Sequence, residues 1–139
     1  MRFQALLLDT VGDAVIASDL DGNITYMNAG AEQLFGWPAA VAVGRRVLGT
    51  LRPDTDRDRW LAARREAAGG TWRGEVTARR RDGTQFPTYV TLASVRGADG
   101  AVTGFIGVSE DISERKRTEQ ALRDHAARWH RSTSTTRKG

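Results

Sequence analysis

Side chains capable of chemistry are few in this 139-residue chain. There is no cysteine, so disulfides, thiolate metal sites and a cysteine nucleophile are all excluded. The two histidines, His125 and His130, lie close together near the C-terminus. No serine–histidine–aspartate arrangement, paired-carboxylate pattern, phosphate-binding loop or metal-ligand spacing is found in the sequence. We therefore expect no enzyme active site and no metal site.

Asp111 is the polar side chain with the clearest predicted role. It follows an apolar, strand-like run and opens a long polar stretch of helical character, and three consecutive arginines, residues 79–81, precede one of the predicted turns. We hypothesise that Asp111 pairs with one of these arginines and fixes the angle at which the helix leaves the domain. The same carboxylate could also cap the helix by accepting its free N–H groups. The two roles are compatible.

Charge is distributed unevenly along the chain. Residues 1–113 contain 13 Lys/Arg and 14 Asp/Glu, a net charge of −1, whereas residues 114–139 contain 8 and 3, a net charge of +5. A basic C-terminal segment could contact nucleic acid or anionic lipid, but such runs are more often the solvated face of a helix. No apolar run approaches the ~18 residues that a membrane span needs, and we expect a cytoplasmic protein.

Three Asp-Gly pairs predict three β-hairpins, because Asp-Gly supplies the positive φ angles that two-residue hairpin turns require. The pairs begin at Asp21, Asp82 and Asp99, and each lies between runs of β-like composition. The runs together form an antiparallel sheet of five predicted strands, which cover residues 14–19, 24–28, 71–80, 85–95 and 101–109.

Helices are predicted between the second and third strands. Asn28 can N-cap a short helix that Gly36 ends, and a turn or short helix follows near residues 38–47. A clearer helix begins after Asp54, the plausible cap, and ends at Gly69-Gly70. Its expected apolar stripe consists of Trp60, Leu61 and Ala68.

The predicted organisation is an N-terminal cap helix over residues 1–12, a core over 13–113, an exit helix over 114–130 and a disordered tail over 131–139. The last strand is apolar on both faces, so we expect the N-terminal helix or a second subunit to cover its outer face. In the exit helix the spacing of four residues gives a weak coiled-coil signal. They are Thr118, Leu122, His125 and Trp129.

Three segments in order resemble a PAS domain, over roughly residues 5–115. They are DAVIASDLDGNITYMNAGAEQLFGW, TWRGEVTARRRDGTQFPTYVTLASV and GFIGVSEDISERKRTEQAL. The last resembles the junction of that family from core to signalling helix, here Asp111-Ile112-Ser113, which makes Asp111 and Ile112 the expected signal relay. The resemblance implies an α+β PAS fold, with short helices on one face of a five-stranded antiparallel sheet and a C-terminal signalling helix.

The resemblance also allows the cofactors of PAS domains to be compared with this sequence. Photoactive flavin domains carry an Asn-Cys pair where Arg46 and Val47 align, so photoactive FMN is not expected. The three polar flavin-ring contacts of those domains align with Ala78, Thr88 and Ser109. Haem is not expected either, because both histidines lie in the exit helix. FAD remains an alternative, since Trp72-Arg73-Gly74 resembles a segment of FAD-binding PAS domains.

Ten residues form the candidate pocket, a mostly apolar set with a few hydroxyls that suits either a ligand cavity or a packed core. They are Ile16, Leu34, Phe35, Val47, Trp72, Ala78, Thr88, Val90, Phe105 and Ser109. We favour a packed core or small cavity with no cofactor. The expected function is a dimeric sensory and interaction module that signals through its C-terminal helix to an effector or partner such as a histidine kinase. A nucleic-acid-binding regulator is the alternative from another class.

Overall fold

The computed structural model describes residues 13–137, and side chains as far as Trp129. One five-stranded antiparallel sheet has the order β2-β1-β5-β4-β3. The predicted five-stranded antiparallel sheet is confirmed. The strands are β1 (Ala14–Asp19), β2 (Ile24–Met27), β3 (Thr71–Arg79), β4 (Gln85–Arg96) and β5 (Val102–Asp111).

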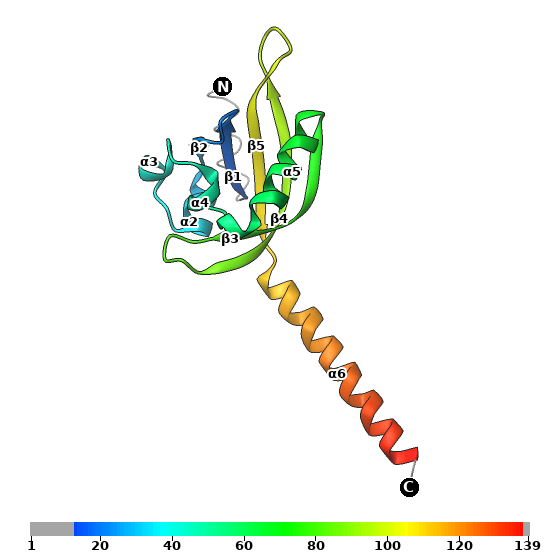
Figure 1. Ribbon diagram of the computed structural model, residues 1–139. Helices are drawn as coiled ribbons and strands as arrows, with labels where there is room; N and C mark the ends of the chain where they lie inside the picture. The colour runs from blue at the N-terminus through cyan, green and yellow to red at the C-terminus, as the bar shows by residue number, and fades with distance from the viewer. Residues whose placement is uncertain (1–12, 138–139) are drawn as a thin grey trace.

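Short helices between β2 and β3 lie on one face of the sheet, and a long helix leaves from the end of β5 (Figure 1). The elements of the first group are α2 (Ala29–Phe35), α3 (Ala39–Ala42), the irregular turn α4 (Val47–Thr50), η1 (Asp54–Asp56) and α5 (Arg57–Ala68). The exit helix is α6 (Ser113–Arg137).

All three Asp-Gly hairpins are present. In the first, the Asp19 carboxylate accepts hydrogen bonds from the N–H groups of Asp21 and Asn23, each at 2.9 Å, and Gly22 has φ 89°. Asn28 caps α2 as predicted, because its Oδ1 accepts from the N–H of Ala31 at 2.9 Å. The Asp-Gly turn before β2 and the Asn28 cap after it therefore determine where this strand begins and ends.

Two details of α5 differ from the sequence prediction. Asp54 belongs to the 3₁₀ turn η1 and is not the cap; the residue at the N-cap of α5 is Asp56, whose carboxylate instead accepts from the N–H of Thr77 at 3.1 Å. The buried stripe of α5 is Trp60, Ala63 and Ala67, since Leu61 and Ala68 are only partly buried. Small alanines bring this helix close to the sheet.

The C-terminal end of the chain also differs from the expected organisation. Helix α6 continues to Arg137, seven residues past the predicted end at 130, because neither Gly nor Pro interrupts it before Gly139. The predicted cap helix over residues 1–12 lies outside the described residues. On the outer face of β5, Ile106 and Val108 are half-buried in the described structure.

The core lies between the helices and the inner face of the sheet. Phe35 of α2 and Phe86 of β4 meet there with ring centroids 6.0 Å apart, and both are buried. In the sheet register Ser109 of β5 lies opposite Val90 of β4, and Asp111 lies opposite Thr88. The inner face of β5 therefore runs from the core directly to the start of α6.

Candidate functional site: a core cavity and the helix junction

Arg52 is the buried charged residue of the described core. It follows the turn α4, where Leu51 and Arg52 donate their backbone N–H groups to the carbonyl of Val47 at 2.9 and 3.1 Å. The whole residue is 2% exposed. Arginine is almost never fully buried unless it is paired, so the environment of this side chain determines what the site can bind.

The guanidinium of Arg52 donates to neutral groups on three strands. Nη1 donates to the hydroxyl of Thr88 at 2.7 Å and to the carbonyl of Thr77 at 3.3 Å, and Nη2 donates to the hydroxyl of Ser109 at 3.0 Å. The Thr88 hydroxyl in turn donates a hydrogen bond to the carbonyl of Val76 at 2.6 Å. Nε of Arg52 is buried without a hydrogen-bond partner. Arg52 therefore links β3, β4 and β5 from the inside.

Two aromatic rings flank the same guanidinium. Its central carbon lies 5.7 Å from the centroid of Phe35 and 5.2 Å from that of Trp60. The negative face of an aromatic ring attracts a cation, and the attraction grows where water is excluded. The rings compensate part of the lost hydration but carry no net charge.

Burial lowers the pKa of Arg52 to about 10, while the charge of Asp56 acts in the opposite direction. The side chain is therefore still charged at neutral pH. None of the ion pairs among residues 13–129 includes Arg52. The core thus holds a positive charge that is hydrogen-bonded but not neutralised.

A cavity of about 20 Å³ lies beside Arg52. Four of the ten predicted pocket residues line it, namely Ile16, Val47, Val90 and Ser109. Six further lining residues were not predicted from the sequence: Ser18, Leu51, Arg52, Trp60, Leu92 and Gly107. The walls are mostly apolar, and the polar groups come from Arg52 and two serines.

The remaining six predicted pocket residues do not line this cavity. Phe35, Ala78, Thr88 and Phe105 are buried in the surrounding core, and Trp72 is partly buried against it. Leu34 lines a separate surface hollow that also includes Asp111. Thr88 and Ser109, which align with polar flavin contacts, here bind Arg52.

Asp111 joins the core to α6 through two contacts. One carboxylate oxygen accepts from Arg80 at 3.3 Å, and the other accepts from the N–H of Ser113 at 2.8 Å. The predicted ion pair is therefore present, with the middle one of the three arginines. Arg80 is held in place because its guanidinium lies 3.9 Å from the ring centroid of Phe86.

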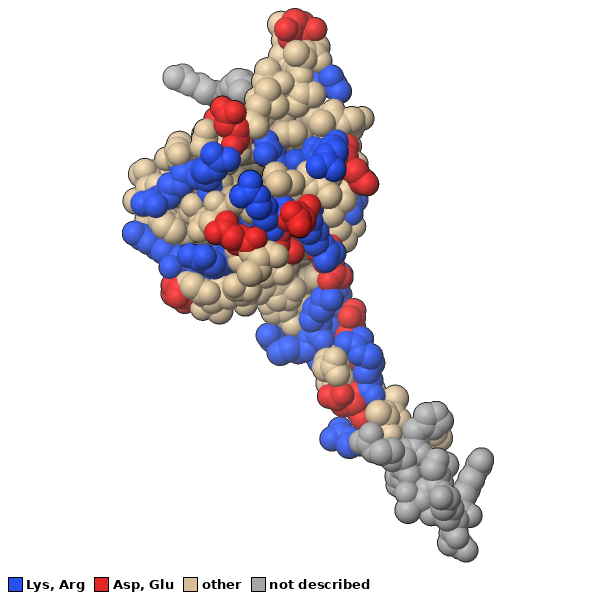
Figure 2. Space-filling view, viewed as in Figure 1, with Lys and Arg blue, Asp and Glu red and all other residues tan. Residues whose placement is uncertain are grey.

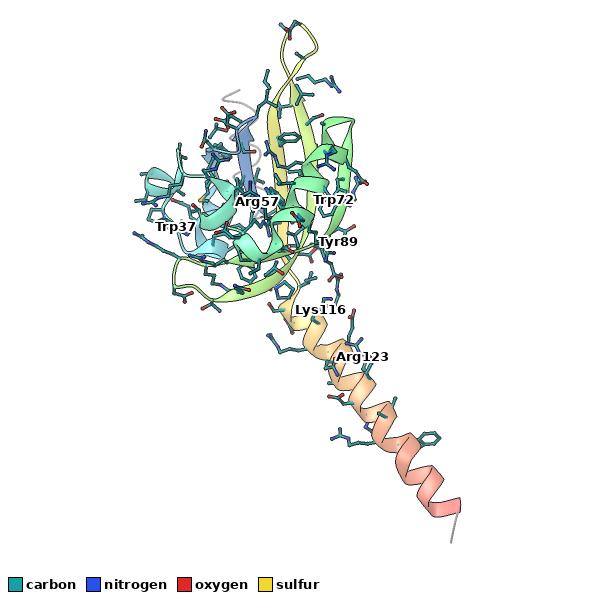
Figure 3. The ribbon with its side chains drawn as sticks, viewed as in Figure 1. Trp37, Arg57, Trp72, Tyr89, Lys116 and Arg123 are labelled. Atoms are coloured by element: carbon teal, nitrogen blue, oxygen red, sulfur yellow. The ribbon has the colours of Figure 1, made fainter. Side chains whose placement is uncertain are left out.

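Besides the Asp111–Arg80 pair, two further contacts attach the start of α6 to the sheet. Ile112 is buried and donates its N–H to the carbonyl of Pro87 at 3.1 Å. Lys116 lies where the helix meets the core (Figure 3) and pairs with Glu75 of β3 at 2.6 Å. This contact lowers the pKa of Glu75 below its usual 4.5, mainly through the hydrogen bond from Lys116.

Beyond these turns α6 is exposed, and positive and negative side chains alternate along it (Figure 2). Arg115 pairs with Glu119 at 3.9 Å, and Gln120 donates to Asp124 at 2.9 Å. His125 lies on this exposed part. Among the described residues no cluster of His, Asp or Glu could hold a metal ion, and no helix combines the length and apolar character of a membrane span.

The fold and the junction define a PAS module, and comparison with known proteins agrees. The family model described as "PAS fold" matches residues 2–112, so the chain belongs to the PAS family. A crystal structure of a PAS domain from Colwellia psychrerythraea superposes with a TM-score of 0.75 and 27% identity, covering 81% of this chain and 97% of that one.

Two curated relatives place this module in signalling proteins. The sensor protein FixL of Bradyrhizobium diazoefficiens is 33% identical over 125 residues, which are 85% of this chain and 24% of FixL. Two-component system protein A of Emericella nidulans is 34% identical over 124 residues, 84% of this chain and 17% of that protein. The chain therefore spans a quarter or less of these relatives, and corresponds to a sensory module within them.

Proposed function

We propose that this sensory module transmits the state of its core cavity through β5 to α6, and so to an effector. The observation that carries the proposal is the strand β5 itself. Ser109 of this strand accepts from Arg52 in the core, and Asp111, two residues later, accepts from Arg80 and from the first turn of α6. A change at Ser109 needs to travel only two residues to reach the helix.

Because the relatives are longer signalling proteins, we propose that the effector is a further domain or a partner protein such as a histidine kinase. The chain itself is proposed to carry no catalytic activity. A homodimer is part of the proposal, since Leu122 and Trp129 of α6 are 65% and 63% exposed and lie seven residues apart on one helix face. Sedimentation of the intact chain tests this part. A cytoplasmic location stays a prediction.

The alternatives from the sequence receive less support. Pockets for organic cofactors enclose roughly 300–1,000 Å³, so a 20 Å³ cavity does not fit FAD, FMN or haem without extensive rearrangement. Two ion pairs neutralise Arg115 and Lys116 in the first turns of α6, which suits a solvated helix better than a nucleic-acid-binding surface. We therefore retain the relay as the proposed function.

Hydrogen exchange of the intact chain tests the relay. Ser109→Ala removes the contact with Arg52 and leaves Asp111 in place. We expect the amides of residues 112–117 to exchange several-fold faster, while those of the sheet centre are unchanged. Asp111→Asn is the positive control, because a partly exposed ion pair contributes about 0.2–1 kcal/mol, or up to about fivefold in local opening.

The matched control is Ser94→Ala, which removes a serine of β4 that is not bonded to Arg52. It should leave residues 112–117 unchanged. If Asp111→Asn accelerates exchange in α6 but Ser109→Ala does not, the junction holds the helix without control by the core. That result would refute the relay.

A further inference from the structure

The buried charge of Arg52 has no carboxylate on it in the described structure. Its three hydrogen bonds go to two hydroxyls and a carbonyl, all neutral. The acidic group that acts on it, Asp56, directs a carboxylate oxygen at the N–H of Thr77 instead. An unpaired charge in a protein interior is costly, and a counter-ion removes most of that cost. The site therefore favours the entry of a negative charge.

The free donors of Arg52 determine the shape of the anion that fits. A guanidinium has five N–H donors, and the three hydrogen bonds leave two of them: the N–H on Nε, which has no partner, and one on Nη2. Nε and Nη2 form one edge of the planar group. Such an edge matches the two oxygens of a carboxylate and holds them with two parallel hydrogen bonds.

The cavity beside Arg52 limits the size of the anion. Its volume of about 20 Å³ exceeds the ~10–15 Å³ that one water molecule requires, so small shifts of the lining side chains would admit a group of very few atoms. Leu51, Val90 and Leu92 are among the lining residues and offer no hydrogen bonds. Such walls disfavour large or doubly charged ions, which would lose more hydration than the site returns.

We propose that this cavity binds a small carboxylate monoanion, of the size of formate or acetate, through the free edge of Arg52 and the hydroxyl of Ser109. The inference rests on the proposed function, because it names the class of ligand that the relay would sense. Binding would redistribute the hydrogen bonds of Ser109 and so act on the strand that leads to Asp111.

Nuclear magnetic resonance of the ¹⁵N-labelled intact chain tests the site directly. Sodium formate replaces sodium chloride at constant sodium concentration, and formamide serves as the neutral probe of similar shape. We expect one arginine Nε–H signal, the one missing in Arg52→Met, to shift saturably with formate and not with formamide. At a formate concentration ten times Kd, the unfolding constant should also fall about 10-fold.

The matched control is Arg57→Met, which removes an exposed arginine of α5 (labelled in Figure 3) and should keep both responses. Arg52→Met should lose both. If that variant does not fold, Arg52→Lys retains the charge without the two-donor edge and should lose most of the formate response. The proposal is overturned if the Arg52 signal stays fixed until exposed arginine signals shift as well, or if formamide acts like formate.

The relay and the anion site can fail separately. If formate binds at Arg52 but exchange in residues 112–117 does not change, the site stands and the relay is refuted. If Ser109→Ala accelerates exchange in those residues but formate does not bind, the relay stands and the anion site is refuted.

Discussion

Arg52 in the core and Arg80 at the junction have similar aromatic neighbours and opposite electrostatic surroundings. Each guanidinium lies over a phenylalanine ring, Phe35 for Arg52 and Phe86 for Arg80. Arg80 is about one-third exposed and pairs with a carboxylate, Asp111. Arg52 is buried, where a counter-ion matters most, and bonds only to neutral groups.

The difference separates a part that holds the structure from a part that can respond to a ligand. A partly exposed pair such as Arg80–Asp111 contributes little energy and serves chiefly to orient the helix. A buried charge without a partner lowers stability, and the molecule gains whatever stability a counter-ion restores. Under the proposal, the stability of the core site therefore depends strongly on what binds there.

The largest expected effect comes from weakening the hydrogen bonds around Arg52 while its charge remains. Thr88→Val keeps the side-chain shape but removes the 2.7 Å bond to Nη1 and the donor to Val76. We expect the free energy of unfolding to fall by about 2–3 kcal/mol, measured by urea denaturation.

Thr91→Val is the matched control, a half-buried threonine of the same strand that does not bind Arg52, and should change the free energy of unfolding by less than about 0.5 kcal/mol. The cost of Thr88→Val should also shrink when Arg52 is replaced by methionine, because the two side chains are coupled. Equal effects of Thr88→Val and Thr91→Val would mean that the hydroxyl of Thr88 does not stabilise the buried charge.

A second experiment compares the two arginines directly. Arg80→Met should lower the free energy of unfolding by at most about 1 kcal/mol, because it removes one partly exposed pair. Arg52→Met removes a buried charge and should leave the free energy of unfolding unchanged, or raise it by about 1 kcal/mol, in buffer without small carboxylates. A loss of more than about 2 kcal/mol for Arg52→Met would make Arg52 chiefly a structural centre.

The smallest effect concerns the pH dependence of the junction. The pKa of Glu75 is lowered, first by its hydrogen bond from Lys116 and further by the charges of Arg115 and Arg59. Its contribution to stability is thus present above the usual value of 4.5 and is lost as the pH falls through the lower value in the folded protein. Carboxyl ¹³C titration should place the midpoint of Glu75 below 4.5 and move it upward in Lys116→Met. An unchanged midpoint in that variant would contradict the contact.

The sequence predicted those parts of the fold that depend on neighbouring residues. The hairpins follow from Asp-Gly pairs, and the start of α2 follows from the side chain of Asn28. The partner of Asp111 could be narrowed to residues 79–81. That Arg80 is the partner follows only from the packed hairpin, in which this arginine lies over Phe86.

Arg52 could not be found in the same way. The surrounding sequence, TLRPDTDRDR, has the composition of an exposed polar loop, and nothing in its spacing marks one arginine for burial. The hydroxyls that bind Arg52 are 36 and 57 residues away along the chain. The stripe of α5 was similarly misjudged, because close packing against the sheet favours Ala63 and Ala67 over the larger Leu61. Both errors concern contacts between distant segments.

The length of α6 has a mechanical consequence. The helix has 25 residues, and at ~1.5 Å per residue it is roughly 38 Å long. Under the proposed relay it would pivot near Ile112, which is buried and bonded to the sheet. A tilt of only about 5° at this pivot would carry the far end through roughly 3 Å. Under the proposed relay the helix would act as a lever, which converts small rearrangements near Ile112 into displacements large enough to realign whatever is attached to its far end.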